Sequence, residues 1–260
     1  MQTKKKFHIS ATALYILTVI ILFCAGIFLC ILTDKEPLAS KNDLVIAFAQ
    51  NHNLSLSAWP DKLITLLEKN PDTAEYVLHY PLKKDVVFAI DLSEYANSEY
   101  VPLLLQWDER WGYTRYGNEM MGLSGCGPTC LSMVCIHLLD DPKYSPRYIA
   151  DFAIQNGYCV PGNGSSWTLI SEGGEKLGLD VTELPLDKNR ILRNLEAGNP
   201  IICVMGPGDF TSTGHFIVMT GCADGKIKVN DPNSPSRSAE LWDYDSIKDQ
   251  IRNLWACRTK

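Results

Sequence analysis

The sequence predicts an α+β fold for its main domain, preceded by a membrane-spanning helix and a small helical segment. Helix patterns come first in the main domain, and short apolar strand patterns follow from about residue 200. The links between those strands are too short for crossover connections, so we expect an antiparallel sheet. We place the anchor at 1–33, the helical segment at 34–98 and the main domain at 99–260.

The composition is that of an ordinary globular chain. Of the 260 residues, 46% are hydrophobic and 21% are charged, so a disordered chain is excluded. The net charge of -6, with no basic run outside the N-terminus, argues against a nucleic-acid partner. We expect no cofactor, and composition does not indicate an oligomeric state.

The N-terminus has the clearest hydrophobic pattern in the sequence. Ala11 to Leu32 carries no charge, and a helix of that length spans about 33 Å, enough for a hydrocarbon core of about 30 Å. The stretch is longer than a secretory signal and lacks a clear small-residue cleavage site, which favours an uncleaved anchor. Lysines at 4–6 place the N-terminus in the cytoplasm. The rest of the chain is then expected outside the cell.

The helical segment is predicted from three- and four-residue apolar spacing in "DKLITLLEKN" and "DTAEYVLHY". Pro60 and Pro71 stand where a next helix would begin. We expect two or three short helices, in which His52 and His79 are surface or packing residues.

The main domain contains four helix patterns followed by three strand patterns. "TCLSMVCIHLL" is apolar almost all round and predicts a buried helix. "SPRYIADFAIQNG", "SSWTLISEGGEKLG" and "NRILRNLEAG" predict three more helices, each ending at glycine. "PIICVMG", "GHFIVMTGCA" and "KIKVNDP" predict strands, the last two joined by a "DG" hairpin turn.

Seven cysteines lie outside the apolar span, because Cys24 and Cys30 fall inside it. That number is odd, and no Cys or Cys/His spacing typical of zinc ligands occurs, so neither a metal site nor a small disulfide-stapled domain is indicated. Most are expected to be small buried hydrophobic residues.

Cys126, in "SGCGPTCLSMV", stands where the buried helix is expected to begin. A helix N-terminus stabilises a thiolate through its free N–H groups and its dipole. Pro128 is tolerated in a first turn, and Gly125 and Gly127 allow a tight backbone and close approach of a substrate. Taken alone, the position favours a structural cysteine over a catalytic one.

Three further residues complete a possible catalytic set. His215 opens a very apolar strand, and Asp231 ends the strand that the "DG" turn folds back alongside it. A carboxylate beside a histidine orients the ring, as a Cys–His pair requires. Gln106, the polar end of an apolar run, could stabilise an oxyanion together with the N–H of Cys126. A loop histidine and an Asp-Pro turn are the alternatives.

These blocks occur in the order found in a known family. "QWDERWGYTRYG", "SGCGPTCLSMV", "NGSSWTLI", "NPIICVMGPGDFTSTGHFIVMTG" and "KIKVNDPNS" lie between about Val101 and Ala256. That segment resembles the peptidase family 39-like domain, whose members are papain-like relatives of the bacteriocin double-glycine leader peptidases. The resemblance implies a papain-like fold, with helices packed on an antiparallel sheet, and a membrane-anchored bacterial member.

By this resemblance, Cys126 is the nucleophile, His215 the general base and acid, Asp231 the orienting residue and Gln106 the oxyanion donor. In the leader peptidases themselves the glutamine lies only a few residues before the cysteine, whereas here the spacing is twenty. The resemblance therefore does not extend to leader peptides as the substrate.

The resulting hypothesis is a membrane-anchored, extracytoplasmic cysteine peptidase that hydrolyses a peptide or related amide bond in a peptide or protein substrate. We expect Trp107, Trp167 and Gly125 to contact the substrate and the loop at 206–214 to border the cleft. The alternative is a binding module with the same fold that holds a peptide or cell-wall fragment without turnover. The sequence does not identify which bond of the substrate is cleaved.

Overall fold

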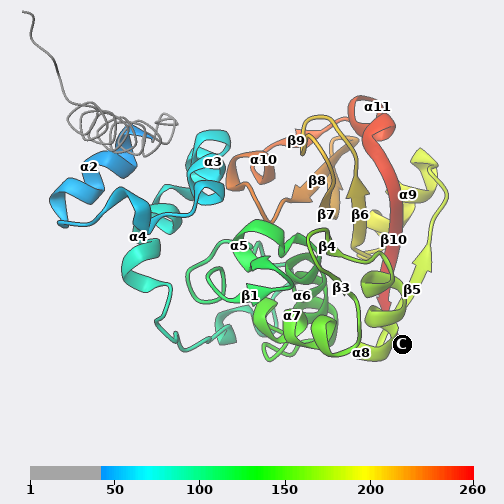
Figure 1. The fold of residues 1–260 in the computed structure, drawn as a ribbon. Helices are drawn as coiled ribbons and strands as arrows, with labels where there is room; N and C mark the ends of the chain where they lie inside the picture. The colour runs from blue at the N-terminus through cyan, green and yellow to red at the C-terminus, as the bar shows by residue number, and fades with distance from the viewer. Residues whose placement is uncertain (1–41) are drawn as a thin grey trace, which may run out of the picture. The chain divides into compact units, whose positions relative to one another are not determined.

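The computed structural model describes residues 42–260, and there the predicted α+β architecture with an antiparallel sheet is confirmed (Figure 1). Six strands form one sheet in the order β5-β10-β6-β7-β8-β9, and every neighbouring pair is antiparallel. The strands are β5 Leu179–Glu183, β6 Ile201–Met205, β7 His215–Ala223, β8 Lys226–Asn230, β9 Leu241–Trp242 and β10 Ile251–Thr259. Two small hairpins pair β1 Arg115–Tyr116 with β2 Glu119–Met120 and β3 Cys159–Val160 with β4 Gly164–Ser165.

The central sheet is covered on both faces. Along β6 every residue is buried: Ile202 and Val204 join one core cluster, while Ile201, Cys203 and Met205 join the other. Because successive side chains point to opposite faces, a strand between two packed layers becomes apolar throughout. This explains the continuous apolar run in the sequence.

Helices supply the two outer layers. Figure 1 shows α6 and α7 (green) on one side of the strands and α9 on the other. The larger elements are α6 Cys126–Leu139, α7 Pro146–Gln155 and α9 Lys188–Glu196. The shorter ones are α5 Met121–Ser124, α8 Gly174–Leu177, α10 Pro235–Ser238, α11 Tyr244–Ile247 and the 3-10 turn η5 Lys248–Gln250.

The structure differs from the sequence prediction in one helix and in several strands. The helix expected across 165–178 is instead a π-helical turn, η4 Leu169–Gly173, continued by the short α8. Strands β5, β9 and β10 of the main sheet and the two small hairpins were not predicted. β5 is a short edge strand with mostly exposed or half-buried positions, and β10 mixes buried residues with polar ones, so neither has a clean two-residue period.

The predicted helical segment is present as α2 Asp43–Asn51, α3 Asp61–Lys69 and α4 Ala74–Lys83, with 3-10 turns η1 Leu56–Ala58, η2 Pro71–Thr73 and η3 Ser93–Tyr95. Pro60 is the N-cap of α3 and Pro71 opens η2, as their positions predicted. These helices share a hydrophobic cluster of their own, which Trp107 and Tyr113 complete from the following segment.

Tyr76 is the main link between this segment and the rest of the protein. Its ring stacks on Tyr113 at a centroid distance of 4.6 Å, and its hydroxyl donates to the carbonyl oxygen of Gly112 at 2.9 Å. The same ring lies directly against Gly122, where a Cβ atom would overlap the Tyr76 hydroxyl. Gly122 is therefore required for the close packing of α4 on the segment that precedes α6.

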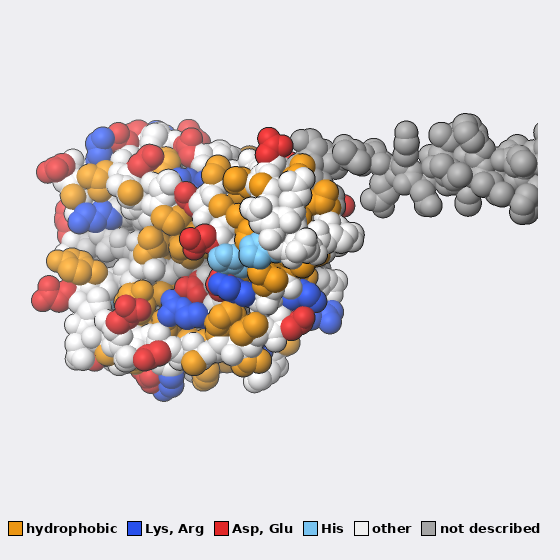
Figure 2. Space-filling model, turned by 90° about the vertical axis from the view of Figure 1, so that its left-hand side faces the viewer, with side chains coloured by type: hydrophobic (Ala, Val, Ile, Leu, Met, Phe, Trp, Pro, Cys, Tyr) orange, Lys and Arg blue, Asp and Glu red, His pale blue; other side chains and the backbone are white. Residues whose placement is uncertain are grey.

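The surface seen in Figure 2 mixes acidic, basic and hydrophobic side chains. Among residues 42–260, no helix combines the length and apolar character needed to cross a bilayer. The anchor predicted at Ala11–Leu32 lies outside the described residues.

Substituting Gly122→Ala tests this packing. We expect the free energy of unfolding to fall by about 1–3 kcal/mol, because the added methyl group overpacks a buried contact. Gly221→Ala is the matched control: nothing lies within 4 Å of its added Cβ, so a change within about 0.5 kcal/mol is expected. Equal denaturant midpoints for both variants would contradict the assignment.

Candidate active site

Cys126 is the first residue of α6, immediately after the N-cap Gly125. The helix has no side-chain cap, and Pro128 occupies the first turn, where a missing N–H costs nothing. Free backbone donors therefore surround a half-buried thiol. Cys130 and Cys135 lie deeper in the same helix, where burial raises the pKa of both thiols well above the ordinary value. Of the three thiols, only Cys126 is poised to ionise.

The glycines beside Cys126 are required by packing. A Cβ atom on Gly127 would lie 2.6 Å from the hydroxyl oxygen of Ser165, and one on Gly125 would lie 2.6 Å from the carbonyl oxygen of Met121. Both distances are far below van der Waals contact. The two glycines thus let the start of α6 pack against its neighbours while the thiol stays accessible.

His215 and Asp231 meet across two neighbouring strands. The register pairs Val218 with Asn230, so Asp231 stands one residue beyond the ladder, diagonal to the start of β7. The Nε2 atom of His215 donates to Oδ1 of Asp231 at 2.7 Å, and both side chains are buried. The hairpin geometry predicted from the "DG" turn is confirmed.

Asp231 has further partners that the sequence did not reveal. Its Oδ2 atom accepts from Nε of Arg237 at 2.6 Å, and its Oδ1 atom accepts from the backbone N–H of Asn233 at 2.7 Å. Arg237 belongs to α10, whose N-cap Ser234 accepts from the Arg237 N–H. The short helix α10, which follows β8, therefore places the Arg237 guanidinium group beside the Asp231 carboxylate. No local sequence motif predicts this contact.

The environment favours a thiolate–imidazolium pair. Burial opposes ionisation of Cys126, but the hydrogen bond and charge of His215, with backbone hydrogen bonds from Phe216 and Gly127, lower its pKa below the ordinary value. Burial likewise opposes the charge on His215, but Asp231 and Cys126 together raise its pKa to about 10. Because Nε2 faces Asp231, Nδ1 is the atom available to Cys126. A lowered thiol pKa beside a raised imidazole pKa favours the state in which both groups are charged.

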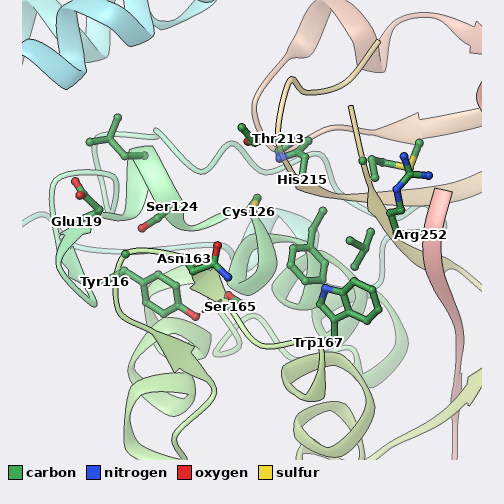
Figure 3. Close-up of a pocket in the computed structure, with 18 of the residues that line it drawn as sticks. Tyr116, Glu119, Ser124, Cys126, Asn163, Ser165, Trp167, Thr213, His215 and Arg252 are labelled. Atoms are coloured by element: carbon green, nitrogen blue, oxygen red, sulfur yellow. Dashed lines mark hydrogen bonds between the residues drawn. The ribbon is translucent and has the colours of Figure 1, made fainter. Parts of the chain in front are cut away.

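A cavity of about 730 Å³ opens over Cys126 and His215 (Figure 3). Tyr116 and Ser165 lie in its wall, with their hydroxyl oxygens 2.7 Å apart. The loop predicted to border the cleft contributes residues 206, 207, 213 and 214. From the helical segment, Lys62 and Thr65 of α3 line it as well. The cavity is large enough for several residues of an extended peptide.

Gln106 lies in the core and not in the cavity wall. Its backbone N–H donates to the carbonyl oxygen of Pro232 at 2.8 Å, and its side-chain Nε2 donates to that of Gly122 at 2.9 Å. It thereby ties the residue after Asp231 to the segment before Cys126. One of the two Nε2 hydrogens of Gln106 is donated to Gly122, so only the second could be donated to an oxyanion. The oxyanion role of Gln106 stays a prediction.

Of the residues predicted to contact substrate, only Trp167 lines the cavity, with 45% of its surface exposed. Trp107 instead packs against the helical cluster and donates from Nε1 to the carbonyl oxygen of Asn233 at 3.2 Å. Gly125 faces Met121. Tertiary packing therefore assigns both residues structural positions beside the site.

Within the described chain, no three His, Cys, Asp or Glu side chains gather in a way that could hold a metal ion. None of the seven cysteines in this part of the chain forms a disulfide bond in the structure.

Residues 98–260 match the peptidase C39-like family. Two solved structures are similar to this chain. The peptidase domain of Streptococcus ComA, a bifunctional ABC transporter involved in a quorum-sensing pathway, is 20% identical over 53% of this chain and 93% of its own, with a TM-score of 0.43. A Bacillus anthracis protein described as a C39-like peptidase is 15% identical over 65% of this chain and 98% of its own, with a TM-score of 0.39. No curated protein matches the chain.

The lowered pKa of Cys126 predicts its labelling by iodoacetamide. Below about pH 8, Cys126 of the full-length protein should react faster than Cys222, because the lowered pKa leaves a larger fraction of the Cys126 thiol ionised. In His215→Ala the imidazolium is lost, so burial dominates, the thiol pKa rises and the advantage disappears.

Site-resolved mass spectrometry across pH 5–9 measures this. Equal labelling rates for Cys126 and Cys222 at every pH would show that the Cys126 thiol is not activated.

Proposed function

This chain belongs to the peptidase C39-like family, and from that premise we propose that it is an active cysteine peptidase that hydrolyses a peptide or related amide bond through Cys126, His215 and Asp231. The substrate is a peptide or protein segment in the cavity above Cys126.

The observation that supports this proposal is a continuous chain of interacting groups ending in the cavity. Arg237 donates to Asp231, Asp231 accepts from His215, and His215 interacts with the Cys126 thiol. Each group stabilises the charged form of the next. A binding module has no use for an activated thiol at the floor of its cleft, which favours turnover.

The first half of the reaction forms an acyl-enzyme. The Cys126 thiolate attacks the substrate carbonyl carbon, and the backbone N–H of Cys126 at the helix start donates to the developing oxyanion. The second Nε2 hydrogen of Gln106 would add a donor there. His215 then gives its Nδ1 proton to the leaving amine as the C–N bond breaks, leaving a thioester on Cys126.

The second half regenerates the enzyme. Neutral His215 takes a proton from a water molecule, whose oxygen attacks the thioester carbonyl carbon. The C–S bond breaks, the acid product leaves, and the thiolate–imidazolium pair is restored. Asp231 keeps its charge throughout and holds the ring in the tautomer that presents Nδ1 to the sulfur.

The same proposal includes location. The uncharged stretch Ala11–Leu32 would anchor the chain as a single-pass membrane protein, and the lysines before it would keep the N-terminus in the cytoplasm. The catalytic domain would then act at the outer surface.

Replacing the nucleophile separates an enzyme from a binder. On a peptide library, Cys126→Ala should lower turnover by at least about a thousandfold because no acyl-enzyme can form, while Cys222→Ala keeps the activity. Product formation is followed by mass spectrometry. Peptides that bind wild type tightly but are never cleaved would identify the binding module instead.

Topology is tested on whole cells that express the full-length chain with a C-terminal tag. Protease added outside should remove the tag, because an anchored domain at the outer surface is accessible to it. A cytoplasmic reporter protein must stay intact as the control. Protection of the tag until the membrane is permeabilised would reverse the proposed orientation.

A further inference from the structure

The two ends of the catalytic cleft differ in charge. Figure 3 shows Glu119 at one end and Arg252 at the other, with Cys126 and His215 between them. At the first end, Glu119 forms an ion pair with Lys62 of α3. Arg252 has no such partner: within residues 42–260, no carboxylate lies at ion-pair distance from its guanidinium group, although four other arginines are paired in this way.

The backbone aims Arg252 at the cleft. It is the extra residue of a β-bulge in β10, because Ile251 pairs with Met205 of β6 and Asn253 pairs with the adjacent Val204. A bulge releases one residue from the ladder and redirects its side chain, and bulges recur beside active sites for this reason. The exposed Arg252 side chain consequently lines the cavity.

A close backbone approach holds the guanidinium group there. It lies against Gly206, the first residue after β6, where a Cβ atom would overlap its nitrogen and carbon atoms. Its Nη1 atom donates to the carbonyl oxygen of Asp249 at 2.8 Å. That bond fixes one side of the fork, and no hydrogen bond from Nε or Nη2 to another group is found among residues 42–260.

Among the described residues, the acidic side chains near this end of the cleft form no ion pair with Arg252. Asp209 of the bordering loop accepts from Nε2 of Gln250 at 2.6 Å. Asp249 offers Arg252 only its backbone oxygen. The cation is therefore left available in the cleft beside Trp167, whose exposed ring presents an apolar surface.

We propose that Arg252 binds a substrate carboxylate at this end of the cleft, so that the preferred substrates carry one a short distance from the scissile bond. This inference rests on the proposed peptidase function and specifies its substrate class. A guanidinium fork with two unengaged donors matches the geometry of a carboxylate. Trp167 would pack on the aliphatic part of the residue that carries it.

Two sources in a peptide supply this group: an Asp or Glu side chain, or the C-terminal carboxylate. Thiol-reactive probes distinguish them without requiring turnover. The terminal series is bromoacetyl-glycine, its diglycine and its triglycine, each compared with its C-terminal amide. The side-chain series is bromoacetyl-Glu-amide and bromoacetyl-Gly-Glu-amide, each compared with its Gln counterpart. In every case the Cys126 sulfur displaces bromide, which leaves as the C–S bond forms.

In the full-length protein, we expect the acidic member of at least one matched pair to label Cys126 about tenfold faster than its neutral twin, the factor typical of one charge-assisted hydrogen bond. The preference should fall to about one in Arg252→Gln and below one in Arg252→Glu. Arg252→Lys should keep part of it, since the charge remains without the fork.

Arg193→Gln is the matched control, because it removes the same charge from an exposed position on α9, away from the cavity. It should keep the full preference. Iodoacetamide labelling of Cys126 should be unchanged in Arg193→Gln, and in the Arg252 variants the ratio within each matched pair cancels any change in the reactivity of the thiol.

The outcomes separate the two proposals. The carboxylate subsite is overturned if iodoacetamide labels Cys126 fast but the acidic and neutral probes of every pair react at equal rates. It is also overturned if the preference for the acidic probe survives Arg252→Gln. Either result leaves the peptidase proposal intact. Slow labelling of Cys126 by iodoacetamide and every probe would overturn the activated thiol, and the subsite with it.

Discussion

The burial of one carboxylate constrains the whole site. Asp231 has no exposed surface, and a buried charge is costly unless its oxygens are hydrogen bonded and an opposite charge is near. His215, Arg237 and the Asn233 N–H meet that requirement together. These contacts hold the start of β7, the turn after β8 and the helix α10 in one arrangement, with the His215 ring fixed against Asp231.

Charge balance extends this constraint to the thiol. With Cys126 and His215 ionised, two negative and two positive groups alternate along the chain from Arg237 to the sulfur, and their sum is zero. Without Arg237, the remaining three would carry a net negative charge in a buried environment, which opposes the thiolate. Arg237 of α10 thus favours the ionised form of the Cys126 thiol through Asp231 and His215.

The helical segment is part of this arrangement. Asn70 donates to the carbonyl oxygen of Asn233 at 2.5 Å, and the hydroxyl of Ser236 donates to Asp72 at 2.9 Å. Both contacts secure the turn that follows Asp231, and α3 also contributes Lys62 and Thr65 to the cavity wall. Segments before and after Cys126 therefore meet around one loop. The helical segment predicted between the anchor and the main domain therefore helps to form the site.

Local pattern determined a large part of this protein. The helix start at Cys126, the strand start at His215 and the strand end just before Asp231 are each visible in a few neighbouring residues, and the hairpin turn sets the register between the two strands. These features depend on backbone hydrogen bonds and side-chain periodicity over short distances. The helical segment, three strands and the antiparallel sheet were predictable for the same reason.

Only the tertiary structure decided the remainder. Trp107 and Trp167 are the same residue type, but one is covered by the helical cluster and the other lines the cavity. The pairing of Arg237 with Asp231 and the bulge that turns Arg252 into the cleft are likewise set by which elements pack together. Such contacts join residues that are distant along the chain or depend on a neighbouring strand, so no local pattern carries them.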